Sequence, residues 1–98
     1  MAATEETGNE EGEALVLASE LGLRALVWTL AEPARALRLI DLTGLSPQDL
    51  KARAGDPAVL AAVLGFLEGH EPDLVACAAQ LGRPPELLVA ARGVLEDA

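Results

Sequence analysis

The sequence predicts an all-α fold, a compact bundle of five or six short helices around a central apolar helix. Leucine and alanine, which favour helices, each occur 19 times among the 98 residues, whereas the chain has one Trp, one Phe and no Tyr. The segment Pro57–Leu67 holds no charged or hydrogen-bonding side chain, so every face of a helix built from it is apolar. Such a helix is too short for a bilayer, which needs about 20 residues. We therefore expect it to be buried at the centre of the bundle.

The chain divides into a short acidic end and one helical body. Residues 1–12 carry four glutamates and no basic residue, and we expect this tail to be disordered. Residues 13–98 are expected to form a single helical domain. The net charge of −9 opposes binding to nucleic acid phosphates or to an anionic membrane.

The single cysteine, Cys77, cannot form an internal disulfide and is expected to be a small buried hydrophobic side chain. The chain does not open on a basic segment followed by an apolar one, as a signal sequence would. The expected location is the cytoplasm.

The first two helices are predicted from their apolar spacing. Glu13–Ala31 is the longest helical stretch, and Gly22 within it indicates a bend or a close contact with another helix. A second helix, PARALRLIDL, follows at once, with Leu37, Ile40 and Leu42 expected to face inward. A Thr-Gly pair ends it, because glycine is favoured just after a helix.

The clearest local signal is the start of the third helix. Ser46 is an N-cap, Pro47 is the first helical residue, and Asp49 supplies the carboxylate of a capping box. Asp56 and Pro57 start the central helix in a similar way.

Two further helices complete the bundle. One opens at Pro72 and ends before Gly82, and the last covers Pro85–Glu96. The prolines recur at similar spacing in the two halves of the chain, which suggests two similar three-helix units over residues 21–54 and 56–94.

Three short motifs carry a resemblance to a known family. They are TGLSP at residues 43–47 with Asp49 and Leu50, DPAVLAAVL at residues 56–64, and the pair Glu71-Pro72. From about residue 25 onward the chain resembles a family of small alphaproteobacterial helical proteins that carry a domain of unknown function. That family often has an acid where His70 stands, so a role specific to the acid is not carried over. The resemblance implies a bacterial, cytoplasmic, helical protein and implies no activity.

The residues that could carry chemistry are few and have simpler interpretations. One histidine and one cysteine, His70 and Cys77, are too few ligands for a conventional zinc site within one chain. Ser46 is explained as a helix cap rather than a nucleophile. A helix-turn-helix over residues 46–67 is rejected, because its second helix has no side chain that reads a base. We therefore predict no catalytic, metal-binding or cofactor-binding residue.

The function predicted from the sequence is a non-enzymatic protein-interaction or regulatory module. The reason is an excess of apolar side chains for so small a body, some of which we expect to bind a partner helix or a second copy. The candidate contact residues are Trp28, Leu39 and Leu42.

Two alternatives remain open. A small enzyme or ligand-binding protein would have a pocket at the junction of the two halves, with His70 and Glu71 and either Asp56 or Asp73 as its polar groups. The chain could instead be a structural subunit of a larger assembly.

Five of the seven basic residues fall in the first predicted three-helix unit, at positions 24, 35, 38, 51 and 53. They form either a basic patch for an acidic partner or, as the simpler interpretation, scattered solvated charges.

Overall fold

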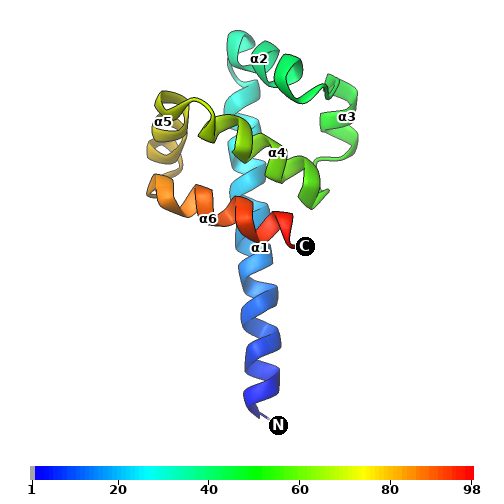
Figure 1. Ribbon diagram of the computed structural model, residues 1–98, viewed down its shortest axis with the longest axis vertical. Helices are drawn as coiled ribbons and strands as arrows, with labels where there is room; N and C mark the ends of the chain where they lie inside the picture. Colours follow the sequence, from blue (N-terminus) through cyan, green and yellow to red (C-terminus); the bar gives the residue numbers. More distant parts are fainter. Residues whose placement is uncertain (1) are drawn as a thin grey trace.

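The computed structural model describes the backbone of residues 2–98 and the side chains of residues 12–98. Within this part of the chain there are six helices and no strand, which confirms the predicted all-α bundle. The helices are α1 (Ala2–Leu30), α2 (Pro33–Thr43), α3 (Pro47–Ala52), α4 (Pro57–Glu68), α5 (Glu71–Leu81) and α6 (Pro85–Glu96). Helix α1 follows the long axis of the molecule, and its N-terminal half extends beyond the other five helices (Figure 1).

The helix starts are set by proline and by capping side chains. Four of the helices begin directly at a proline, whose fixed φ suits the first helical position. At α3, Ser46 Oγ accepts a hydrogen bond from the Asp49 N–H at 3.1 Å, and Asp49 Oδ2 accepts one from the Ser46 N–H at 3.2 Å. This is the predicted capping box. At α4, Asp56 Oδ1 accepts from the Ala58 N–H at 2.9 Å.

Two helix ends require glycine. Gly44 after α2 and Gly82 after α5 have φ values of 72° and 70°, in the left-handed region that side chains with a Cβ avoid. Both lie where the sequence predicts the end of a helix, and both redirect the chain so that the next helix packs back on the bundle.

Helix α4 lies at the centre of the bundle, as its sequence predicts. It crosses in front of α1, and α6 runs beside it (Figure 1). Its most extensive contacts are with α6 and α1, and it also packs against α5 and α2. Six of its side chains are buried: Val59, Leu60, Ala61, Val63, Leu64 and Leu67. They belong to a single hydrophobic cluster to which all six helices contribute, so the two predicted three-helix units share one core.

The α1–α4 contact is close because Gly22 has no side chain. A Cβ built at Gly22 would lie 2.9 Å from Leu60 Cβ, nearer than real Cβ atoms come to a neighbour. Gly22 therefore marks a close helix contact, which was one of the two interpretations that the sequence left open. It also identifies the side of α1 that faces the core.

The inward face of α2 differs from the prediction. Leu39 is the fully buried residue of α2, whereas Leu37 and Leu42 are exposed and Ile40 is partly buried. Helix α2 is bent by 118° from α1 and packs on α1 and α4, and Leu39 is its side chain that joins the shared hydrophobic core.

The prediction of a disordered tail concerns residues 1–12. The backbone of residues 2–12 continues α1, but side chains are described only from Gly12 onward. Disorder of this tail stays a prediction, as does the single-domain boundary at residue 13.

Candidate interaction surface

Helix α1 carries apolar side chains on two opposite faces. Its inner face holds Ala18, Leu21, Ala25 and Leu26, which are buried against α4 and α6. Its opposite face holds four exposed apolar residues, which we call the outer stripe: Val16, Leu23, Val27 and Leu30. Residues spaced by three, four or seven positions lie on one side of a helix, so these four form a continuous line. Val16 and Val27 are 68% and 69% exposed.

Two charged residues accompany the outer stripe. Glu20 lies in line with it, four residues after Val16 and three before Leu23, and Arg24 lies next to it. Both side chains are exposed. The outer stripe is therefore apolar at both ends and carries one carboxylate and one guanidinium near its middle.

A groove between α1 and α5 adjoins the middle of the outer stripe. Its walls are Leu23, Arg24, Val27 and Trp28 from α1 and Gln80 and Leu81 from α5, and its volume is about 400 Å³. The lining is mostly aliphatic and aromatic. Because Leu23 and Val27 belong to both features, the outer stripe and the groove form one surface.

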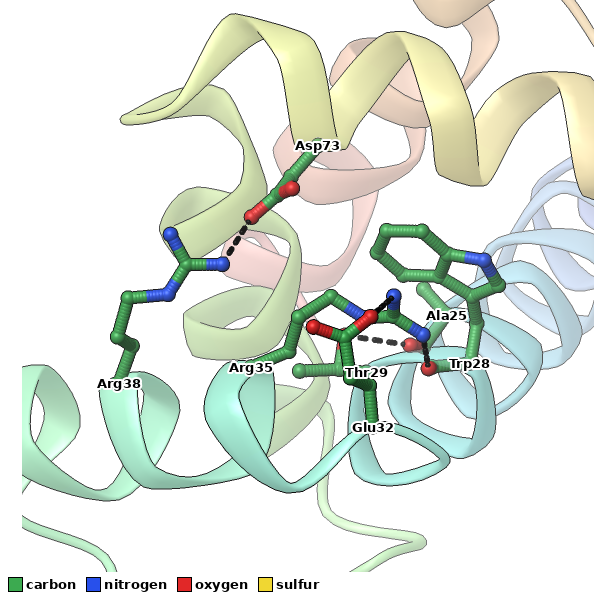
Figure 2. Close-up of polar contacts among 7 residues, drawn as sticks. All are labelled: Ala25, Trp28, Thr29, Glu32, Arg35, Arg38 and Asp73. Atoms are coloured by element: carbon green, nitrogen blue, oxygen red, sulfur yellow. Dashed lines mark hydrogen bonds and ion pairs between the residues drawn. The ribbon is translucent and has the colours of Figure 1, made fainter.

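The groove ends at a fixed corner between α1 and α2. The Arg35 guanidinium lies over the Trp28 ring, with its central carbon 3.7 Å from the ring centroid. Arg35 Nη2 donates to the Trp28 carbonyl oxygen at 2.6 Å, and Nη1 donates to Glu32 Oε2 at 2.6 Å (Figure 2). The Arg35 side chain is only 14% exposed. This stack holds the indole in place, so Trp28 is a rigid, partly buried end of the groove.

The rest of the corner is held by two further bonds. The Thr29 hydroxyl, which is fully buried, donates to the Ala25 carbonyl oxygen at 2.8 Å. Arg38 Nη2 on α2 donates to Asp73 Oδ2 on α5 at 2.8 Å (Figure 2). The ion pair joins α2 to α5 through two residues that are 35 positions apart in the sequence.

Three of the arginines that the sequence offered for a basic patch are paired with carboxylates. Arg35 pairs with Glu32, Arg38 with Asp73, and Arg53 Nη2 with Asp56 Oδ2 at 3.0 Å. Their positive charges are therefore balanced locally, and these residues do not form a strongly basic surface.

The structure places the three predicted contact residues differently. Leu42 is 76% exposed, and Trp28 lines the groove. Leu39 is 0% exposed, so its assignment to a partner surface is corrected: it belongs to the core of the bundle. Leu42 lies on α2 beside Phe66 and His70, in a hollow separate from the outer stripe.

Sequence reasoning missed the outer stripe as a contact surface. The signal was present in the spacing of Val16, Leu23, Val27 and Leu30, and in the position of Gly22 on the other side of the helix. Without the structure, that glycine marked either a bend or a contact, so the inner face of α1 was not fixed.

The polar groups of the alternative pocket do not all come together, because Asp56 lies apart from His70. Asp56 precedes the first residue of α4 and His70 follows its end, so the 12-residue helix separates them by about 18 Å. Asp73 is paired with Arg38. Glu71 is exposed at the start of α5. Among the described residues, no group of three or more His, Cys, Asp or Glu side chains is placed to hold a metal ion.

Another hollow lies between α4 and α6. It has a volume of about 690 Å³ and is lined by small residues of α4 and by Glu68, Arg92 and Glu96. Arg92 Nε donates to Glu68 Oε2, Nη2 to Glu68 Oε1 at 3.3 Å, and Nη1 to Glu96 Oε1 at 2.6 Å. The hydrogen bonds to Glu68, and then those to Glu96, raise the pKa of Arg92. This guanidinium is occupied in joining α4 to α6.

Cys77 is buried in α5, as predicted. Burial raises the pKa of its thiol to about 11, so the group is protonated at neutral pH and is a poor nucleophile.

Within the described residues, no single helix combines the length and apolar character needed to cross a membrane. Residues 12–30 and 33–43 meet that requirement only when they are taken together, and they are bent by 118°.

Taken together, these features define a small helical protein with one shared core and one apolar helix face turned away from that core. The chain belongs to a protein family of unknown function, DUF3572, whose sequence profile matches residues 16–98. Searches of curated proteins and of solved structures gave no match.

Proposed function

We propose that this chain is a non-enzymatic protein-interaction or regulatory module of the bacterial cytoplasm, and that it binds its partner through the outer stripe of α1. One observation carries the proposal: α1 is apolar on the face that packs on α4 and α6 and also on the opposite face, where the side chains of the outer stripe are exposed. Contiguous exposed apolar surface of this kind is typical of a binding site.

The form of the outer stripe favours a helical partner. Val16, Leu23, Val27 and Leu30 extend along one side of a straight helix, and the adjoining groove offers a hollow for inserted side chains. An amphipathic helix docks on such a surface with apolar residues at spacings of three and four. Each Val or Leu side chain that becomes fully buried contributes about 1.5–3 kcal/mol relative to full exposure.

The polar groups support a role without catalysis. Asp49 and Asp56 cap helices, Asp73 and Glu68 pair with arginines on other helices, and the Cys77 thiol is protonated. Each of these groups has a structural role in the fold. The net charge of −9 disfavours nucleic acid and anionic membranes as partners.

Site-specific photo-crosslinking in bacterial cells that produce the chain tests the proposal. A benzophenone side chain replaces Val27 on the outer stripe or, as the matched control, Val89, an exposed valine on α6. We expect Val27 to give a discrete cross-linked product containing a second polypeptide, and Val89 to give none. Equal products from the two positions, or none from Val27, would reject the outer stripe as the binding surface.

A further inference from the structure

Resting on the function proposed above, we propose that the outer stripe is occupied by the outer stripe of a second copy of this chain, with the two α1 helices antiparallel about a two-fold axis on the outer side of α1, level with residue 22. The inference names the partner that the exposed face of α1 fits best. It depends on the spacing of the outer stripe, on its charges and on the access to it.

The spacing is that of a coiled-coil seam. Val16, Glu20, Leu23, Val27 and Leu30 follow one another at intervals of four, three, four and three residues. Two helices that carry this repeat pack side by side, with the residues of one seam inserted between those of the other. A seam on a single helix needs a second helix, and the described part of the chain places none over it.

The charges select the antiparallel orientation. With the two-fold axis level with residue 22, Glu20 of one copy lies opposite Arg24 of the other, and the symmetry repeats this pair. Val16 of each copy then lies beside Val27 of the other, so these two apolar side chains of the outer stripes cover each other. Charge pairing of this kind fixes the orientation and register of two helices.

The parallel orientation is disfavoured by the same charges. It would place Glu20 of one copy against Glu20 of the other, within the seam. It would also bring together the two acidic runs, each with four glutamates in residues 1–12. Like charges that face each other across an interface oppose association.

A second helix has open access to the outer stripe. The bundle packs on the opposite face of α1, and α2 bends away by 118° towards α4. The described side chains of α1, residues 12–30, span about 28 Å. A contact confined to this length is smaller than a standard interface of about 800 Å² per partner. We therefore expect a weak dimer whose population depends on protein concentration.

Sedimentation equilibrium of the full chain tests whether the dimer forms. Between about 1 µM and 1 mM, the mass should rise from 10.1 kDa towards twice that value. Leu23→Glu, on the outer stripe, should raise the dissociation constant at least about tenfold, whereas Val89→Glu on α6 should leave it unchanged. A wild-type chain that stays monomeric at 1 mM, or a dimer that is equally sensitive to both substitutions, overturns the proposal.

Two charge reversals test the pairing of Glu20 with Arg24. Glu20 and Arg24 are both exposed, so neither substitution disturbs the core. Glu20→Arg alone and Arg24→Glu alone should each weaken self-association about tenfold. An equimolar mixture of the two variants should form heterodimers at least as well as the wild type dimerises, because each Arg of one chain then faces a Glu of the other. A mixture no tighter than the separate variants rejects the antiparallel pairing.

Failure of this inference is distinct from failure of the proposed function. If the chain stays monomeric while position 27 still cross-links to a different polypeptide, the outer stripe is a binding surface for another protein and the second copy is not its partner. If neither result appears, both proposals fall.

Discussion

Helices α4 and α1 are both rich in apolar residues, yet α4 buries most of them against the other helices whereas α1 leaves a line of them exposed. The buried side chains of α4 face α1, α6, α5 and α2, whereas α1 packs its inner face on α4 and α6 and leaves the outer stripe in solvent. A helix that is apolar all round is expected to be buried on all sides. For α1, the described chain buries the inner face and leaves the outer stripe exposed.

The difference arises from position rather than from composition. α4 lies between the other helices, and α1 forms one side of the molecule and extends beyond it (Figure 1). The close contact at Gly22 and Leu60 fixes which side of α1 faces inward. The outer stripe follows from that contact, because it lies on the opposite side of the same helix.

The largest expected difference between the two helices is in stability. Leu64 in α4 is fully buried, so Leu64→Ala should lower the free energy of unfolding by about 2–5 kcal/mol. Leu23 on the outer stripe is partly exposed, and Leu23→Ala should change the free energy of unfolding by less than about 1 kcal/mol. Urea denaturation at low protein concentration measures both. Equal losses would mean that the outer stripe is part of the core.

A glycine substitution tests the contact that orients α1. In Gly22→Ala, the added Cβ meets Leu60 Cβ, and relief of that overlap should cost about 1–3 kcal/mol. The higher helix propensity of alanine offsets up to about 1 kcal/mol of this cost. Gly93 in α6 has nothing within 4 Å of an added Cβ, so Gly93→Ala should be neutral or stabilising. Thermal unfolding measures the stability of the two variants. A Gly22→Ala chain more stable than the wild type would show that α1 and α4 do not approach closely at Gly22.

A smaller effect concerns the start of α4. The hydrogen bond from the Ala58 N–H, and then that from Arg53, hold the pKa of Asp56 below its ordinary value. A carboxylate whose pKa is lowered by folding stabilises the protein at pH values above its ordinary pKa. This stabilisation is lost as the pH falls through the folded-state pKa. The melting temperature should therefore fall as pH drops below about 4. Asp49 contributes in the same direction, through its bonds with Ser46.

Asp56→Asn provides the control for this acid effect. Asparagine also caps helices but does not titrate, so the variant should lose less stability between pH 6 and pH 3 than the wild type. Identical pH profiles would show that the Asp56 carboxylate does not contribute to the acid sensitivity.

The local features of the fold were predictable because their causes lie within a few residues. The capping box at Ser46 and Asp49, the ends at Gly44 and Gly82, and the buried central helix all follow from neighbouring side chains. The all-α class follows from composition in the same way.

The inward face of α2 was not predictable, because it depends on contacts between distant parts of the chain. Three leucines and one isoleucine within PARALRLIDL allow more than one inward face. Leu39 is the buried side chain of α2 in a structure where α2 bends away from α1 and Arg38 pairs with Asp73, a residue 35 positions away. The candidate surface was missed for a related reason: only the packing of Gly22 on Leu60 shows which apolar side chains of α1 remain outside.

The exposure of the outer stripe is tested most directly by thiol labelling of Val27→Cys, with Cys77 as a control in the same molecule. At pH 8 a thiol with a pKa of about 11 is ionised in about one molecule in a thousand, and Cys77 is also buried. At low protein concentration we predict rapid modification of the thiol at position 27, while Cys77 stays unmodified until the chain is denatured. Slow modification at both positions would contradict the account, because it would show that the chain itself covers the outer face of α1.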